Sequence, residues 1–300
     1  MTSQSNGWVR VTRTHRCPEC DGSDNCTVST DGRVVWCGRV ESDRMNAGGQ
    51  WLHRIDDDGG ARGHRPRVPQ PPPPRPKSSG TGTKWRDIAI AGLRHPRLTE
   101  KRDELARHLG VSVTALERLK VGWSLSKCWT FPERDADGQI IGILRRWPDE
   151  RKLQLAGSAR GLTFAKDWAE TKGPVYLVEG PSDTAALMTL GLCVIGRFND
   201  KGGSELLAEL LARHAMDRQL IVIGENDRKS HESLKPAVRE RHSPECDGCS
   251  SCWPGKFGAI AIAEKLSQYL CREIDWSLPP DSAKDSREWL NLMTSGAGRG

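Results

Sequence analysis

The sequence predicts an α/β fold, in which a parallel sheet with flanking helices is preceded by a mixed α+β segment and a small cysteine-rich N-terminal module. Three observations support this fold class. From residue 173 onward, short apolar runs alternate with helical stretches, as in a parallel sheet covered by helices. Four cysteines lie within the first 40 residues. A proline-rich stretch separates the two parts.

Length and composition set the broad class. Three hundred residues suit about two domains, and a hydrophobic content of 36% supports a core of moderate size. There is no signal-peptide stretch, and no apolar run approaches the ~20 residues that span a bilayer. We therefore expect a cytoplasmic protein with no membrane partner. In that reducing setting, cysteines are metal ligands or buried thiols, and Cys128, Cys193 and Cys271 are expected to be buried.

Residues 1–55 predict a zinc ribbon. Cys17 and Cys20 form a Cys-x-x-Cys pair, and Cys26 and Cys37 follow on either side of a hairpin with an Asp-Gly turn. Four thiolates suit tetrahedral zinc and leave no open position, so the metal is structural. Such a small module depends on the metal for its folding energy. The alternative is four unrelated cysteines.

Residues 56–83 are rich in Gly, Arg and Pro, which favours a semi-rigid linker; a proline-rich docking peptide is the alternative. Residues 84–170 form a predicted basic core segment. Its first part, 84–119, has helical spacing with a break at Gly110, which indicates packed helices or a helix-turn-helix. Its second part, 121–166, predicts a β-hairpin around an Asp-Gly turn.

Residues 171–300 hold the predicted parallel sheet, with an insertion at about 228–253. We expect strands at 175–178, 192–195, 220–224 and 273–276. We expect helices at 182–190, 203–213 and 258–271.

The net charge of +6 is unevenly distributed. Residues 1–83 contain 12 Lys and Arg against 9 Asp and Glu, residues 84–170 contain 17 against 12, and residues 171–300 contain 16 against 18. The basic surplus therefore lies outside the C-terminal part. This division suits a polyanion bound by one part and cations bound by the other, with an ordinary solvated surface as the alternative.

Carboxylates follow two of the predicted strands. Glu179 and Asp183 follow the first strand, and Glu225 and Asp227 follow the third. Parallel strands end at one edge of a sheet, where four carboxylates would repel one another unless a cation were bound. Oxygen ligands suit Mg²⁺. Taken singly, these residues are also explained as helix caps and surface charges.

The two acidic segments, Leu177-Val-Glu-Gly-Pro-Ser-Asp183 and Val222-Ile-Gly-Glu-Asn-Asp227, resemble the motifs of the Toprim (topoisomerase–primase) domain. The order of zinc ribbon, linker and Toprim core resembles that of bacterial replicative primases. The compact size and the cysteine-rich insertion are similar to primase-like Toprim proteins of phages and mobile elements. The resemblance implies a Toprim-type parallel sheet, with Glu179 as general acid/base or metal ligand. It implies Mg²⁺ or Mn²⁺ at Glu225 and Asp227, with Asp183 at the same site, although the family usually has aspartate in place of Glu225.

The resemblance extends to the flanking segments. A Gly-x-x-x-Gly hairpin followed by Arg146, Lys152 and Lys166 is similar to the basic face beside the metals of replicative primases. Lys284 and Asp285 resemble the late Lys-Asp segment of that family. The resemblance implies that the basic residues hold the DNA template or the nucleoside triphosphate.

The loops after the second and third strands carry further candidates. Arg197 either faces the site or lies on a loop surface, and Arg228 and Lys229 contact phosphate or form a solvated loop. The insertion also predicts a second zinc site, for which His231 is a rival ligand. The predicted ligands of that site are His242, Cys246, Cys249 and Cys252.

The implied function is DNA-dependent primer synthesis. A nucleotidyltransferase would join nucleoside triphosphates on single-stranded DNA by two-metal phosphoryl transfer. Trp36 of the ribbon either stacks on a template base or belongs to the ribbon's core. Because the sequence has no Gly-x-x-x-x-Gly-Lys-Ser/Thr loop, we expect any replicative helicase partner on a separate chain. The alternatives are a Toprim-type metal-dependent nuclease and a non-catalytic zinc-ribbon DNA-binding protein.

Overall fold

The structure is a computed structural model of the chain. It describes residues 8–12, 14–30, 32–42, 44–46, 49–55, 81–199, 202–240, 242–280 and 282–296. The chain divides into an N-terminal unit, Met1–Arg67, and a C-terminal unit, Val68–Gly300. Most of the predicted linker, 56–80, lies outside the described residues. Its predicted end at residue 83 is too late, because helix α1 (Thr81–Leu93) already begins at Thr81 and is anchored by the buried Trp85.

The N-terminal unit is a four-stranded antiparallel sheet. Its strands, in sheet order, are β1 (Trp8–Arg10), β2 (Thr27–Ser29), β3 (Val34–Cys37) and β4 (Trp51–Arg54). The predicted hairpin between Cys26 and Cys37 is the pair β2 and β3. The small core combines buried cysteines with three buried valines, Val11, Val28 and Val35. Trp36 lies on the opposite face of β3, with its ring centroid 6.2 Å from that of Trp8.

The C-terminal unit begins with the predicted helices and hairpin. The helices are α1, α2 (Leu98–Leu109) and α3 (Val113–Arg118). Gly110 ends α2 in the left-handed conformation, at φ +70°, and Ser112 caps α3 by accepting the Ala115 N–H. An antiparallel sheet follows, in the order β5 (Gly122–Trp123), β6 (Trp129–Arg134), β7 (Ile140–Arg146) and β8 (Lys152–Gln154).

The predicted parallel sheet lies in the second half of this unit. Its order is β10 (Cys193–Arg197), β9 (Val175–Glu179), β11 (Leu220–Ile223) and β12 (Asp275–Ser277). The connecting elements are α4 (Gly180–Thr189), α5 (Ser204–His214), η2 (His231–Ser233), α6 (Pro236–Arg239), α7 (Pro254–Leu270) and, at the end, α8 (Ser286–Gly296). The strand–helix alternation and the overall fold class are confirmed.

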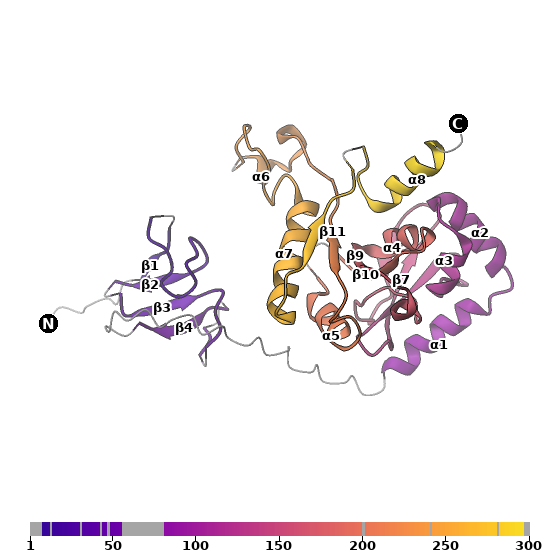
Figure 1. Ribbon diagram of the computed structural model, residues 1–300, viewed down its shortest axis with the longest axis horizontal. Coiled ribbons are helices and arrows are strands. Elements are labelled where there is room, and N and C mark those ends of the chain that lie inside the picture. Colours follow the sequence, from indigo (N-terminus) through magenta and orange to yellow (C-terminus); the bar gives the residue numbers. More distant parts are fainter. Residues whose placement is uncertain are drawn as a thin grey trace. The chain divides into compact units, whose positions relative to one another are not determined.

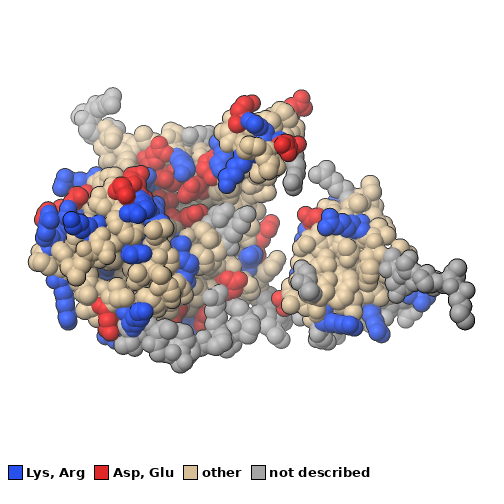
Figure 2. All heavy atoms as spheres, turned by 180° about the vertical axis from the view of Figure 1, so that it is seen from behind, with Lys and Arg blue, Asp and Glu red and all other residues tan. Residues whose placement is uncertain are grey.

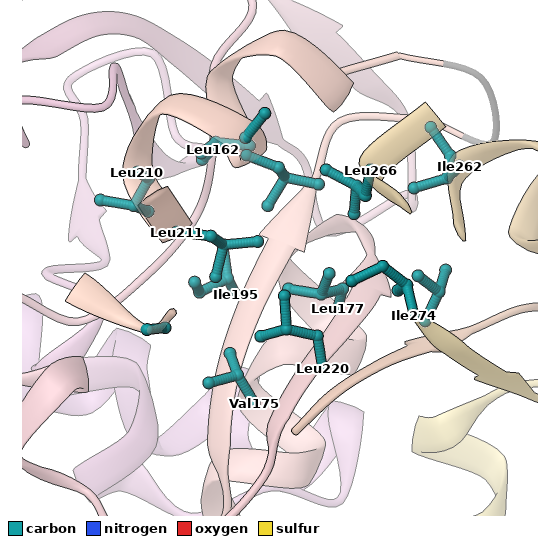
Figure 3. Packing of buried hydrophobic residues seen from close by; sticks show 14 of the residues in the cluster. Leu162, Val175, Leu177, Ile195, Leu210, Leu211, Leu220, Ile262, Leu266 and Ile274 are labelled. Carbon is teal, nitrogen blue, oxygen red and sulfur yellow. The ribbon is translucent and has the colours of Figure 1, made fainter. Parts of the chain in front are cut away.

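Both faces of the parallel sheet are apolar and covered by helices (Figure 1). On one face, Val175 and Leu177 pack with α5 and α7, including Leu211 and Leu266 (Figure 3). On the other face, Val178 packs with residues of α2, α3, α4 and α8 and with the β6–β7 hairpin. This second core joins the basic segment to the parallel sheet.

A short segment also connects the two sheets by hydrogen bonds. Leu162 pairs with Arg134 of β6, and Thr163 pairs with Gly196 of β10, in both cases antiparallel. The Thr163 and Gly196 backbones exchange two N–H···O bonds of 2.8 Å. The direction of this segment is therefore fixed against β10.

Three cysteines, Cys128, Cys193 and Cys271, lie outside the two predicted zinc-binding groups. Cys128 and Cys193 are buried, as predicted, but the prediction is wrong for Cys271, which is exposed. Cys271 follows the last residue of α7 in the left-handed conformation, at φ +53°, and its side chain faces solvent. Among the described residues, none of the helices combines the length and apolar character needed to cross a lipid bilayer.

Candidate functional site

The carboxyl ends of the parallel strands meet at one edge of the sheet. Glu179 is the last residue of β9, and its register partner on β10 is Arg197. On the other side, Leu177 pairs with Val222, so the chain leaves β11 level with Glu179. The Gly224 N–H donates to the Ser277 carbonyl of β12 at 2.9 Å. The residues that follow all four strands therefore start from a common edge.

Asp183 is the most buried carboxylate of this edge. It lies in the first turn of α4 and is only 6% exposed. Burial raises its pKa well above the usual range, and the nearby carboxylates of Asp285 and Glu225 raise it further. A hydrogen bond from the Arg287 backbone N–H acts in the opposite direction without cancelling the shift. The three carboxylates therefore repel one another, and a bound cation would reduce this repulsion.

Glu225 is held by Lys284. The Lys284 Nζ lies 3.4 Å from the Glu225 Oε2, and this contact raises the pKa of Lys284. The backbone supports the pair, because the Asn226 N–H donates to the Lys284 carbonyl at 2.6 Å. Asp285 follows directly and accepts the Glu288 N–H at the start of α8. The late segment thus contributes Asp285 to this edge of the sheet. We call the edge, with Glu179, Asp183, Glu225, Asp227 and Asp285, the acidic edge.

Asp227 lies at the amino end of α7. Its Oδ1 accepts the Gly255 N–H at 2.9 Å, where the partial positive charge of a 17-residue helix favours a carboxylate. The approach is close, because a Cβ on Gly255 would lie 2.4 Å from the Glu225 carbonyl oxygen and 2.8 Å from the Asp227 Oδ1. Only glycine fits without displacing both acidic residues.

Replacing Gly255 with alanine is therefore expected to destabilise the fold by about 1–3 kcal/mol, the usual cost of overpacking. A gain in helix propensity of about 1 kcal/mol offsets only part of it. Urea denaturation measures the change, with Glu264→Ala, on the exposed face of α7, as the control. An unchanged Gly255→Ala midpoint would show that α7 can shift without cost.

Glu179 faces a buried guanidinium. The Arg197 Nη1 lies 3.9 Å from the Glu179 Oε2, and Arg197 is 1% exposed. The same guanidinium donates to the Asn199 carbonyl at 2.9 Å and to the Ile223 carbonyl at 3.2 Å. Arg197, whose position the sequence left open between the site and a loop surface, lies at the site.

Two of the predicted basic residues lie beside the acidic edge. The Arg146 Nη1 donates to the Ser182 Oγ of α4 at 3.5 Å. Partial burial lowers the pKa of Lys152, as do the guanidinium groups of Arg146 and Arg287, whereas Asp183 raises it. Figure 2 shows acidic side chains gathered in a recess of the C-terminal unit, with basic side chains next to them. Sequence reasoning did not single out Arg287, which lies two residues after Asp285 in the late segment.

Lys166, expected on the same basic face, lines a cavity beside the end of α5. Because Thr163 pairs antiparallel with Gly196, the chain after it runs toward the amino end of β10, away from Glu179. Lys166 lines a cavity of about 420 Å³ with Arg213 and His214, in the last turn of α5. That helix is about 16 Å long and begins at the acidic edge, so its end lies far from the carboxylates.

Arg228 and Lys229 begin the insertion directly after Asp227. Both are exposed, and the Arg228 guanidinium lies over the Trp253 ring, 5.4 Å from its centroid. The Lys229 N–H donates to the Cys252 carbonyl at 2.7 Å. Both cations therefore flank the acidic edge on the side of the insertion.

Two groups of side chains have the spacing of a metal site. Within the part of the chain that the structure describes, these are the only sets of three or more Cys, His, Asp or Glu whose ligand atoms lie within 4.8 Å of one another. The carboxylates of the acidic edge are more widely spaced, with Lys284 and Arg197 beside two of them. The first group is Cys17, Cys20, Cys26 and Cys37, and the second is His242, Cys246, Cys249 and Cys252.

The sulfur spacing of the first group fits zinc. The Cys26 Sγ lies 3.7 Å from the Cys20 Sγ and 3.8 Å from the Cys37 Sγ. A tetrahedron with Zn–S bonds of about 2.3 Å has edges of about 3.8 Å, whereas a disulfide bond is only about 2.05 Å long. Backbone N–H groups of Gly38 and Val40 point at these sulfurs, as they do around thiolates.

The fold is similar to that of known primases. No protein-family model matches the sequence, and no curated protein matches it. The catalytic domain of DnaG primase, solved bound to single-stranded DNA, is 15% identical, with a TM-score of 0.51 over 73% of this chain and 76% of that chain. The zinc-binding and RNA polymerase domains of Aquifex aeolicus primase are 12% identical, with a TM-score of 0.50 over 95% of this chain and 76% of that chain. The chain therefore has the fold of a DNA primase catalytic domain.

Proposed function

We propose that the chain is a DNA-dependent primase-like nucleotidyltransferase that makes short primers on single-stranded DNA. One observation carries the proposal: in a primase-type fold, Asp183, Glu225 and Asp285 share one electrostatic field at the strand ends, beside Arg146 and Lys152. Such a field attracts divalent cations, for which carboxylate oxygens are preferred ligands.

Glu179, Glu225 and Asp227 are the residues that would hold Mg²⁺ or Mn²⁺. Their oxygen atoms suit these cations, and the nearby carboxylates of Asp183 and Asp285 would add to the attraction. When bound, the cations would activate the attacking hydroxyl and stabilise the leaving pyrophosphate. A cation that binds Glu225 would displace the Lys284 ammonium group from that carboxylate.

The remaining residues position the substrates. Glu179 would accept the proton of the 3′-hydroxyl, one of the roles that the Toprim resemblance implies for it. Arg146, Lys152 and Arg228 supply charge-assisted contacts to the triphosphate or to the template. The Cys17–Cys37 group binds structural zinc, and its Trp8–Trp36 pair offers a stacking surface to the template.

Template-directed synthesis tests the proposal. The full chain is incubated with single-stranded DNA, labelled ribonucleotides and Mg²⁺ or Mn²⁺, and the products are separated by length. We expect short new oligoribonucleotides that disappear with a chelator. In Glu179→Gln they should fall by about 10²–10⁴-fold, the usual effect of losing a general acid or base. The exposed Glu170, changed to Gln, is the matched control.

Other outcomes identify the alternatives. Shortened DNA that depends on Glu179 would indicate a nuclease with the same acidic edge. DNA binding without any product, unchanged when Glu179, Glu225 and Asp227 are all replaced, would indicate a non-catalytic DNA-binding protein. Either outcome contradicts primer synthesis.

A further inference from the structure

The insertion between β11 and α7 has almost no apolar core. Its regular elements are the short η2 and α6. Among the described residues from 228 to 251, only Leu234 is buried. Burial of one leucine contributes about 1.5–3 kcal/mol, which is far below the entropy cost of ordering a segment of this length. Another interaction must hold the insertion in one conformation.

The second cysteine group has the geometry of a zinc site. The Cys252 Sγ lies 3.9 Å from the Cys246 Sγ and 3.8 Å from the Cys249 Sγ, close to the tetrahedral edge of about 3.8 Å. His242 supplies an independent sign of a ligand, because both of its ring nitrogens are buried and neither has a hydrogen-bond partner. A buried orphan nitrogen costs about 1–3 kcal/mol unless something binds it.

His231 is not the fourth ligand. Its Nε2 contacts the His242 carbonyl oxygen at 3.0 Å, and its ring lies 5.7 Å from the His242 ring. It therefore supports the backbone of His242 and leaves the fourth position to the His242 side chain.

The ligand segment is tied to the residues that follow Asp227. The Lys229 N–H donates to the Cys252 carbonyl at 2.7 Å, and Arg228 contacts the Cys246 carbonyl at 3.5 Å. Three residues after Cys252, Gly255 donates to Asp227. Hydrogen bonds therefore connect both ends of the insertion to the cysteine group, next to the acidic edge.

We infer that His242, Cys246, Cys249 and Cys252 bind a second zinc ion, and that this zinc orders the insertion so that Asp227 and Arg228 keep their positions. The inference of a zinc site does not depend on the proposed function. Only its effect on nucleotide transfer rests on that function.

Metal analysis of the purified full-length chain tests the site. We expect two zinc ions per chain, one for each group. Cys249→Ser should lose one of them, whereas Cys249→His, which retains a ligand, should keep both. The controls are Cys271→Ser and His231→Ala, which should also keep both. A wild-type chain with one zinc, unchanged in Cys249→Ser, would overturn the inference.

Amide hydrogen exchange tests the ordering. In Cys249→Ser, the amides of 228–230, Trp253, Gly255 and Lys256 should exchange about tenfold faster or more, because the closed loop opens locally. Unchanged exchange in β9 and β10 shows that the variant is folded. Unchanged exchange at Lys229 would contradict the positioning role. Because neither measurement needs primer synthesis, failure of the zinc site and failure of the proposed function are separable.

Discussion

Replacing Asp183 with asparagine is expected to stabilise the metal-free chain and to lower nucleotide transfer by about 100-fold or more. The stabilisation follows from burial: Asp183 is 6% exposed and shares its surroundings with the carboxylates of Asp285 and Glu225. Asparagine keeps the shape and still accepts the Arg287 N–H, but it carries no charge. The loss of activity follows because the acidic edge then attracts cations less strongly.

The pH dependence of this stabilisation has a definite sign. In the unfolded chain an aspartate titrates near pH 3.9, whereas folding raises the pKa of Asp183 well above that value. Below the unfolded pKa the carboxyl is protonated in both states and has no effect. As the pH rises from there toward the folded pKa, the unfolded state releases its proton first, so the wild type loses stability. The advantage of Asp183→Asn should therefore grow over this window.

Thermal unfolding at several pH values measures the difference between the two chains. A gain of about 1 kcal/mol would raise the melting temperature by about 2–4 °C in a unit of this size. Mg²⁺ should reduce the difference, because it stabilises the ionised wild type. Asp217→Asn, at an exposed position, is the control. A wild type that is more stable than Asp183→Asn at neutral pH without divalent cations would contradict the prediction.

The strands and helices of the parallel sheet were predictable because each element carries its own signal. Val175 and Leu177 face one core and Val178 the other, so a strand buried on both faces reads as a continuous apolar run. Glu179 and Asp183 are visible in the sequence for the same reason, since they interrupt this pattern at the strand end.

The residues that pair with Glu225 and Glu179 were less predictable, because they come from distant segments. Lys284 reaches Glu225 only after α7 and β12 have returned the chain to the same edge. Arg197 reaches Glu179 through the register of β9 and β10. The course of the chain toward Lys166 was also not predictable, because the pairing of Thr163 with Gly196 sets its direction and no local pattern records that pairing.

The largest expected effect on folding comes from Cys26→Ser. Cys26 is 2% exposed and lies between Cys20 and Cys37 in the first cysteine group. Zinc contributes an apparent 10–16 kcal/mol in small zinc-finger peptides. The three buried valines of this unit contribute only about 1.5–3 kcal/mol each. We therefore expect the variant to lose one zinc per chain and the amide protection of β2 and β3.

Two comparisons separate loss of the metal from loss of a DNA contact. The C-terminal unit has its own cores, so the exchange of β9 and β10 should not change in Cys26→Ser. Trp36→Ala should keep the zinc and the amide protection, because Trp36 lies outside the valine–cysteine core. It should nevertheless weaken binding to single-stranded DNA by about 1–3 kcal/mol, the stacking contribution of one base. A Cys26→Ser chain with full zinc content and protected β2 and β3 amides would show that this unit folds on its apolar core alone.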